Sequence, residues 1–403
     1  MSFKFNLKRF LKKENAVVIW AFILVGLAGV FLGANVKKIQ LPTLTTVKST
    51  FVENISSSQL NRQLTNKDFV LINVHTPYEG EIAGTDLFIN YDEMVANRSK
   101  LPQDLNQKIV LYCKTGRMSA EALTTLKGLG YTNVTHLAGG MDAWQKAGFK
   151  VLDLAKLPDE VLPADGFTLL VTWKDMGPKL VELGIIDKSK FENAIKLTDE
   201  QKKILNEGSE DSITINNANS QFVVDMLWAL GLAQKSIVYD EGPLGTEYKN
   251  EQDSFASTGG WTLAKGNAVN YLNKYDLIPL TSDQQKRVGE IAKNIYRPCC
   301  GNSTWFPDCN HGMAALAAVE LLVSKGLSDE EIYKEILKLN SFWFPDNYLM
   351  VATLFARQGV SWNEIDAKEV LGEKYSSAQG AGELYEKVGP LPYGGSSGGS
   401  CGA

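Results

Sequence analysis

The chain has 403 residues, of which 44% are hydrophobic and 22% are charged, and its net charge is −5. This length allows two or three domains, and this composition is ordinary for a globular protein with a hydrophobic core. Nucleic acid is not expected as a partner, because the net charge is mildly negative and basic residues form a block only at the N-terminus.

The N-terminal region has the pattern of a membrane anchor. Residues 1–15 are basic, and residues 16–34 are nineteen uncharged residues in a row. A helix of this length spans about 28 Å, close to the thickness of the hydrocarbon core of a bilayer. Five basic residues precede the run and only Lys37 and Lys38 follow it closely. This bias predicts a single helix in the cell membrane, a cytoplasmic N-terminus and extracytoplasmic globular domains. A cleaved signal peptide is the alternative, although its apolar region is typically about 7–15 residues long.

A polar, threonine-containing tether over residues 35–52 leads into a first domain at residues 53–152. In this domain the runs 68–74 and 108–113 are predicted to be short buried strands, and residues 119–130 are predicted to be a helix that glycine ends. Strands and helices that alternate in this way indicate an α/β fold with a parallel sheet.

Residues 153–392 have the signals of a mainly α-helical domain. In a capping box, a Ser or Thr side chain at a helix start accepts a hydrogen bond from the backbone N–H of the residue three positions later. That residue is Glu or Gln, and its side chain accepts a hydrogen bond from the backbone N–H of the Ser or Thr. The sequence predicts such boxes at Thr198–Gln201, Ser282–Gln285, Ser328–Glu331 and Ser361–Glu364. The final segment, residues 393–403, is predicted to be a flexible Gly/Ser tail, and it contains Cys401.

The stretch KIVLYCKTGRMSAEAL, residues 108–123, has the pattern of a reactive cysteine loop. Cys113 is expected at the carboxyl end of a parallel strand, which is the edge where α/β proteins bind ligands. The residues that follow open a helix, whose first N–H groups and dipole favour negative charge. With Lys114 and Arg117 nearby, the thiol is expected to ionise easily and to act as a nucleophile.

This loop resembles the active-site loop of rhodanese-like sulfurtransferases, in which a glycine follows the cysteine at the third position and an arginine stands soon after. The resemblance extends to residues 71–84 (LINVHTPYEGEIAG) and to residues 136–144 (HLAGGMDAW). It implies that Cys113 takes sulfur from a small donor as a persulfide and passes it to an acceptor thiol or to cyanide, without a cofactor. It also implies catalytic roles for Cys113 and Arg117. The substrate-binding loop implied by the resemblance contains Lys114, Thr115, Gly116, Met118 and Ser119.

Some positions differ from the usual pattern of the family. Asn73 and His75 stand where an Asp-x-Arg pair is usual, and Glu81 replaces the histidine of a Gly-His-Ile motif. Arg117 is one position nearer to the cysteine than in many members. A cysteine phosphatase, which also occurs on this fold, is excluded because its arginine would stand six residues after the cysteine, where this chain has a serine. We interpret His75 and His136 as ordinary residues of the domain.

A second group of thiols lies in the helical domain, in the stretch YRPCCGNSTWFPDCNHGMAAL at residues 296–316. One helix is expected to end near residues 297–298 and another to begin at HGMAAL, which leaves a short loop between them. The soft ligands in this loop are Cys299, Cys300, Cys309 and His311.

Three interpretations of this group stay open. A disulfide between Cys309 and one of the two adjacent cysteines suits an oxidising exterior. A soft-metal site for zinc or copper(I) suits three thiolates and an imidazole. A redox or sulfur-relay site suits a Cys309 thiol of low pKa beside His311.

Cys401 is interpreted as a mobile thiol that relays sulfur from Cys113 or attacks a disulfide in the second group. The alternatives are a site for intermolecular pairing and an incidental cysteine at a disordered end. The sequence as a whole predicts a membrane-anchored, extracytoplasmic sulfurtransferase that acts on a small sulfur donor and a thiol acceptor. The alternative function is a soft-metal-binding or thiol-redox relay protein whose rhodanese-like fold is a partner or delivery module.

Overall fold

The computed structural model describes residues 53–389 and residue 391. The predicted anchor at 16–34, the tether at 35–52 and the tail at 393–403 with Cys401 lie outside the described residues. Within the described part of the chain, no helix is both long enough and apolar enough to cross a membrane.

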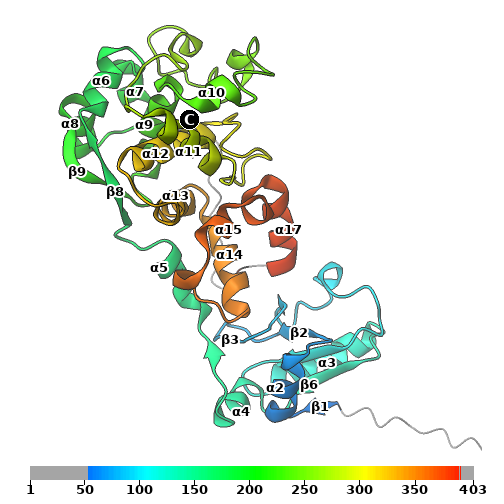
Figure 1. Cartoon of the computed structure of the whole chain (residues 1–403). Helices are drawn as coiled ribbons and strands as arrows, with labels where there is room; N and C mark the ends of the chain where they lie inside the picture. Colours follow the sequence, from blue (N-terminus) through cyan, green and yellow to red (C-terminus); the bar gives the residue numbers. More distant parts are fainter. Residues whose placement is uncertain (1–52, 390, 392–403) are drawn as a thin grey trace, which may run out of the picture. The chain divides into compact units, whose positions relative to one another are not determined.

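The first part of the described chain, which carries the labels β1, β2, β6, α2 and α3 in Figure 1, is built on a parallel sheet. Its five strands have the order β1-β6-β5-β2-β4. These strands are β1 Asn54–Ile55, β2 Val70–Asn73, β4 Leu87–Phe88, β5 Ile109–Tyr112 and β6 Val134–Leu137. The longer helices of this part are α2 Ser57–Thr65, α3 Arg117–Gly128 and α4 Gly140–Lys146. A separate antiparallel pair is formed by β3 Glu81–Ile82 and β7 Val151–Leu152. The predicted α/β class with a parallel sheet is confirmed.

The alternation of side chains along β5 decides which helix covers which face of the sheet. Ile109, Leu111 and then Cys113 pack into one apolar cluster, which also contains buried side chains of α3. Val110 and Tyr112 pack into the opposite cluster with side chains of α2 and α4. Both faces are covered, as parallel sheets require. The same alternation directs Cys113 toward α3.

The second part of the described chain is mainly helical, as predicted. Its helices are α5 Leu157–Val161, α6 Met176–Glu182, α7 Lys188–Ala194, α8 Asp199–Glu207, α9 Ser220–Ala233, α10 Ile237–Glu241, α11 Ser282–Ala292, α12 Asn310–Ser324, α13 Asp329–Trp343, α14 Pro345–Arg357, α15 Ala367–Leu371, α16 Glu373–Ser376 and α17 Ala378–Val388. Helices α9 and α12 pack against each other, and nearly all of their side chains are buried. Neither therefore has the polar stripe of a surface helix.

The helical part also contains an antiparallel strand pair that the sequence analysis does not predict, β8 Phe167–Lys174 and β9 Ser209–Ile215. The pattern of β8 is that of a half-buried strand, because Leu169, Val171 and Trp173 are buried and alternate with more exposed residues. The first half of β9 is polar, so its pairing with β8, rather than its own pattern, holds it as a strand.

Capping explains several helix starts. The predicted boxes are confirmed at Thr198–Gln201, Ser328–Glu331 and Ser361–Glu364. The box predicted at Ser282–Gln285 is wrong by one residue, because Thr281 caps α11 and exchanges hydrogen bonds with Gln284. Gln285 has a different partner: its Oε1 accepts a hydrogen bond of 2.8 Å from the N–H of Ile237.

Two of the buried carboxyl groups in the helical part have raised pKa values. Asp225 on α9 is 1% exposed and Glu320 on α12 is 0% exposed. Burial raises the pKa of Asp225 to about 7 and the pKa of Glu320 to about 8, because the ionised form loses its hydration. The folded protein therefore holds protons that the unfolded chain releases at lower pH.

We expect the contribution of Glu320 to the free energy of unfolding to fall as the pH rises from about 4.5, its pKa in the unfolded chain, to about 8, its pKa in the folded protein. In this window Glu320 binds more protons in the folded state than in the unfolded state, so its contribution to the slope with pH is negative. Glu320→Gln should flatten the slope by on the order of 1 kcal/mol per pH unit. Urea unfolding at several pH values measures this, with Glu386→Gln on the exposed side of α17 as the control. Equal slopes in wild type and Glu320→Gln would contradict it.

Candidate functional site

The Cys113 sulfur lies at the N-terminus of α3. Cys113 directly follows β5 and is 1% exposed. Its Sγ accepts a hydrogen bond of 3.1 Å from the N–H of Gly116, and its thiol donates to Ser119 Oγ at 3.5 Å. Gly116 caps α3 with φ +96°, a left-handed conformation that glycine adopts without strain. The positive end of the helix dipole and an N–H group thus face the sulfur.

The glycine pair after β6 fixes the loop that carries Cys113. The N–H groups of Met141 and Asp142 donate to the carbonyl oxygens of Cys113 and Lys114 at 2.8 and 3.0 Å. Gly140 has φ +58°, and a Cβ atom there would lie 2.2 Å from the Cys113 carbonyl oxygen. Only a residue without a side chain allows this approach. The first residues of α4 therefore fix the cysteine loop through backbone hydrogen bonds.

Polar contacts through Ser119 connect the Cys113 sulfur with His136 on β6. Ser119 is fully buried, and its Oγ lies 3.0 Å from Nδ1 of His136 and donates to Gly116 O at 3.1 Å. Burial lowers the pKa of His136, which favours the neutral imidazole. From the sequence alone, His136 is interpreted as an ordinary residue of the domain. The pairing of β6 with β5, which brings it beside the loop, has no local signal in the sequence.

The charged residues of the loop are turned to the surface. Lys114 forms an ion pair with Glu79, and Arg117 forms one with Glu121 at 2.6 Å. The Arg117 guanidinium also lies over the ring of Tyr91, 5.7 Å from its centroid. The structure therefore brings Gly116 and Ser119 to the sulfur, whereas Lys114 and Arg117 have carboxylate partners elsewhere.

Of the other two loop residues, one is exposed and the other contacts His75. Thr115 is exposed, and Met118 Sδ lies 3.3 Å from Nδ1 of His75. His75, which the sequence analysis treated as an ordinary residue, therefore contacts the cysteine loop. Asn73 is fully buried and shapes the segment that follows it in the chain. Its side chain donates a hydrogen bond to Gly80 O and accepts one from the N–H of His75.

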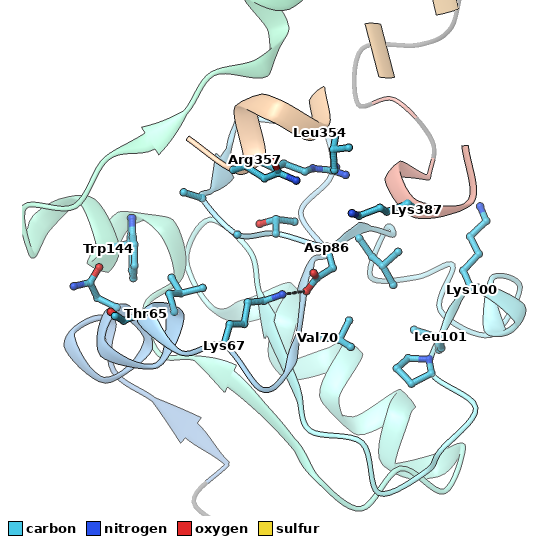
Figure 2. A pocket seen from close by; sticks show the side chains of 18 of the residues that line it. Thr65, Lys67, Val70, Asp86, Lys100, Leu101, Trp144, Leu354, Arg357 and Lys387 are labelled. Carbon is cyan, nitrogen blue, oxygen red and sulfur yellow. Dashed lines mark hydrogen bonds and ion pairs between the residues drawn. The ribbon is translucent and has the colours of Figure 1, made fainter. Parts of the chain in front are cut away.

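A cavity of about 1100 Å³ lies beside α2 and β4 and is also lined by α14 and α17 (Figure 2). Its charged lining residues are Lys67, Asp86, Lys100, Arg357 and Lys387. Lys67 and Asp86 form an ion pair with each other. No residue of the loop 113–119 lines this cavity, so it offers space for a ligand but not for chemistry at Cys113.

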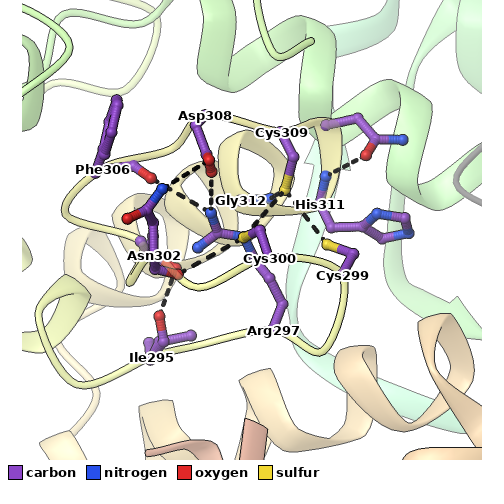
Figure 3. A network of polar contacts seen from close by, with 12 residues as sticks. Ile295, Arg297, Cys299, Cys300, Asn302, Phe306, Asp308, Cys309, His311 and Gly312 are labelled. Atoms are coloured by element: carbon purple, nitrogen blue, oxygen red, sulfur yellow. Dashed lines mark hydrogen bonds and ion pairs between the residues drawn. The ribbon is translucent and has the colours of Figure 1, made fainter. Parts of the chain in front are cut away.

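The second group of thiols converges at the N-terminus of α12 (Figure 3). Cys309 is the N-cap residue, and its Sγ accepts hydrogen bonds from the N–H of Gly312 at 3.4 Å and from Nε of Arg297 at 3.1 Å. The sulfurs of Cys299 and Cys300 lie 3.5 and 4.0 Å from that of Cys309. We call Cys299, Cys300 and Cys309 the thiol cluster. Its members are free thiols, because a disulfide would hold two sulfurs about 2.05 Å apart.

Arg297 is a member of this site that the sequence analysis missed. The prediction that a helix ends near residues 297–298 is wrong, because α11 ends at Ala292 and the N–H of Tyr296 donates instead to Leu371 O. Arg297 is fully buried and forms an ion pair of 2.8 Å with Asp308. A Cβ atom on Gly312 would lie 2.5 Å from the Arg297 guanidinium carbon, so the glycine leaves room for the arginine.

His311 is set apart from the thiol cluster. Among the described residues, the three cysteine sulfurs lie within 4.8 Å of one another, and His311 is not in that group. Its ring packs against Phe344, with centroids 4.6 Å apart. Burial lowers the pKa of His311 to about 4. Hydrogen bonds from the other two thiols, followed by the charge of Arg297, lower the pKa of Cys309. The lowered pKa of Cys309 is therefore due to the other two thiols and to Arg297, and His311 is not among its causes.

The comparisons with known proteins concern the first part of the chain. A family model described as a rhodanese-like domain matches residues 56–147. The chain is 42% identical over 87 residues to a probable adenylyltransferase/sulfurtransferase MoeZ of Mycobacterium tuberculosis, covering 20% of this chain and 21% of the relative. The chain thus spans about a fifth of the length of these first curated relatives.

A smaller relative is covered almost completely. The chain is 30% identical over 105 residues to a sulfurtransferase of Allochromatium vinosum, which covers 25% of this chain and 95% of the relative. Among solved structures, a rhodanese-related protein from Thermoplasma volcanium is 27% identical, covers 25% of this chain and 97% of its own, and has a TM-score of 0.22. Through its rhodanese-like domain at residues 56–147, the chain belongs to the rhodanese-like family.

Proposed function

We propose that the protein is a sulfurtransferase that carries sulfur as a persulfide on Cys113. The observation that supports this most directly is the position of the Cys113 sulfur at the N-terminus of α3, 3.1 Å from the N–H of Gly116. A thiolate there is stabilised by an N–H donor and by the helix dipole. The sulfurtransferases among the relatives are similar to this domain and support the same reaction class.

The proposed reaction has two displacements. The Cys113 thiolate attacks the outer sulfur of a donor such as thiosulfate, the S–S bond of the donor breaks, and sulfite leaves with the electron pair. The thiolate of an acceptor then attacks the outer sulfur of the Cys113 persulfide. The bond between Sγ and the outer sulfur breaks, and the Cys113 thiolate is regenerated. Neither step needs a cofactor.

Ser119 and His136 provide a path for the thiol proton in this proposal. The Cys113 thiol donates to Ser119 Oγ, and that oxygen lies 3.0 Å from His136 Nδ1. For this path the Ser119 hydroxyl turns its proton from Gly116 O to His136 Nδ1, and a neutral imidazole with its own proton on Nε2 accepts it. In this proposal Ser119 and His136 assist the ionisation of the Cys113 thiol. The surface residues Lys114 and Arg117 do not have this role.

The direct test is incubation of the purified protein with thiosulfate. The peptide that contains Cys113 is expected to gain one sulfur atom, measured by mass spectrometry after alkylation. Addition of cyanide should release that sulfur as thiocyanate. A protein that forms neither product with thiosulfate or with a small persulfide donor would contradict the proposed reaction.

The proposed location is the outer side of the cell membrane, with one helix at residues 16–34 as the anchor. The support is the charge bias of the sequence, with five basic residues before the apolar run. An impermeant protease added to intact cells should therefore degrade residues 53–403, and an antibody to this part should report the loss. A cytoplasmic protein serves as the control for intact membranes. Full protection until the membrane is opened would contradict this topology.

The thiol cluster supports a second candidate function, a soft-metal-binding or thiol-redox protein in which the rhodanese-like domain delivers a partner. The specific observation is the convergence of three sulfurs on one helix N-terminus in the helical part. The two candidates predict different results for Cys113→Ser. Sulfur transfer requires Cys113, whereas chemistry confined to the thiol cluster does not.

A further inference from the structure

We propose that Cys299, Cys300 and Cys309 form a three-thiolate binding site for a soft metal ion, zinc or copper(I). The distances between the sulfurs carry this inference. The Sγ of Cys309 lies 3.5 Å from that of Cys299 and 4.0 Å from that of Cys300, and all three lie within 4.8 Å of one another. Two sulfurs bound to one tetrahedral ion through bonds of about 2.3 Å are about 3.8 Å apart. The cluster is therefore spaced for an ion.

The presence of a third thiol distinguishes this site from a disulfide. A disulfide, or a redox pair that forms one, needs two sulfurs close enough to bond. In this structure both members of the Cys299-Cys300 pair face the same Cys309 sulfur. A metal ion uses all three, whereas a disulfide with Cys309 would leave one thiol without a role.

The surroundings of Cys309 are suited to a ligating sulfur. Arg297 Nε and the N–H of Gly312 both donate to its Sγ, and hydrogen bonds of this kind orient the ligands of metal sites. The guanidinium is fully buried and is fixed by its ion pair with Asp308, so it is held in place as a donor to the Cys309 sulfur. Gly312 is needed for this arrangement, because a side chain there would displace the arginine.

The donor set selects the class of metal. Three sulfurs without a carboxylate in the group favour soft ions and disfavour magnesium and calcium, which bind through oxygen. The three cysteines are partly exposed, so an ion has a route to the site. With three protein ligands, one position of a tetrahedral ion stays open for an exogenous ligand. His311, outside the group of three, is not required.

The experiment uses the full-length chain, purified with reductant and stripped with a chelator. One sample is loaded with zinc and another, anaerobically, with copper(I), and elemental analysis after desalting gives the metal content. We expect about one equivalent of at least one of the two ions. Cys299→Ser, Cys300→Ser and Cys309→Ser should each weaken retention against a competing chelator on the order of tenfold or more. Cys113→Ser, which removes a thiol in the rhodanese-like domain, is the matched control and should retain the metal.

Cobalt(II) gives an independent measurement on the unaltered protein. A thiolate-to-cobalt charge-transfer band in wild type, reduced in each cluster variant and unchanged in Cys113→Ser, is the expected result. The presence of the band in wild type is measured without any substitution, so that part of the result does not depend on whether a variant folds. Absence of the band together with absence of retained zinc and copper(I) would overturn the proposal, and so would equal metal retention in the cluster variants. The result is independent of sulfur transfer, since Cys113 is not a ligand.

Discussion

Cys113→Ser will abolish sulfur transfer from every donor that the wild-type protein uses. A serine oxygen cannot take up sulfur as a persulfide, so the first displacement has no nucleophile. The substitution is nearly isosteric at a site that is 1% exposed, and the N–H of Gly116 can donate to the new hydroxyl group as it does to the sulfur. The fold is therefore expected to persist. Thiocyanate formation from thiosulfate and cyanide measures the loss.

The control for this prediction is Cys300→Ser, which removes a partly exposed thiol in the helical part. It should leave thiocyanate formation unchanged. Arg117→Ala is expected to have a small effect, because the Arg117 side chain is 60% exposed and is paired with Glu121. An exposed pair is worth about 0–1 kcal/mol, which corresponds to at most about a fivefold change in rate. Unchanged turnover in Cys113→Ser would show that the nucleophile has been assigned to the wrong residue.

The parts of the site that the sequence predicts are those with local causes. A buried strand followed by a cysteine, a glycine and a helix start specifies the position of Cys113 within a few residues. The glycine pair at Gly139-Gly140 stands in a stretch that the family resemblance covers, and its backbone conformation lets α4 approach the cysteine loop. The first feature depends on neighbours in the sequence, and the second depends on a recognisable motif.

The parts that the sequence misses depend on tertiary contacts that no local pattern specifies. His136 reaches Ser119 only because β6 pairs with β5, and Arg297 reaches Cys309 only because α11 ends early. A helix-ending Arg-Pro pair is an ordinary pattern, so nothing local indicated that this arginine is fully buried. Strand β9 was missed for the same reason, since its polar residues become a strand only beside β8.

The departure from the family pattern at Glu81 also has a distant cause. Glu81 stands in the rhodanese-like domain and is fully buried, and its carboxylate accepts two hydrogen bonds from Arg357 on α14, at 2.8 and 3.0 Å. The two residues are 276 positions apart in the sequence. Arg357 Nη1 also donates to Val388 O at the end of α17. One arginine thus links the β3 segment to two helices of the helical part.

Breaking this ion pair should have the largest effect on stability of any single substitution proposed here. Arg357→Met leaves the Glu81 carboxylate buried without its partner, and removing one member of a buried pair costs about 3–5 kcal/mol. Glu81→Gln is expected to be destabilising as well, because the guanidinium then lies buried beside a neutral amide. The urea concentration at the midpoint of unfolding measures both effects.

The double variant Glu81→Leu/Arg357→Met decides whether the loss comes from the unpaired charge. If it does, the double variant should recover most of the stability lost by Arg357→Met, since replacing a buried pair by apolar side chains is often neutral or stabilising. Arg287→Met is the control, because it breaks an arginine–carboxylate pair with Asp329, whose side chain is 60% exposed, and should cost about 0–1 kcal/mol. A double variant as unstable as Arg357→Met would mean that the arginine acts through its packing and its bond to Val388, and that Glu81 is not its main partner.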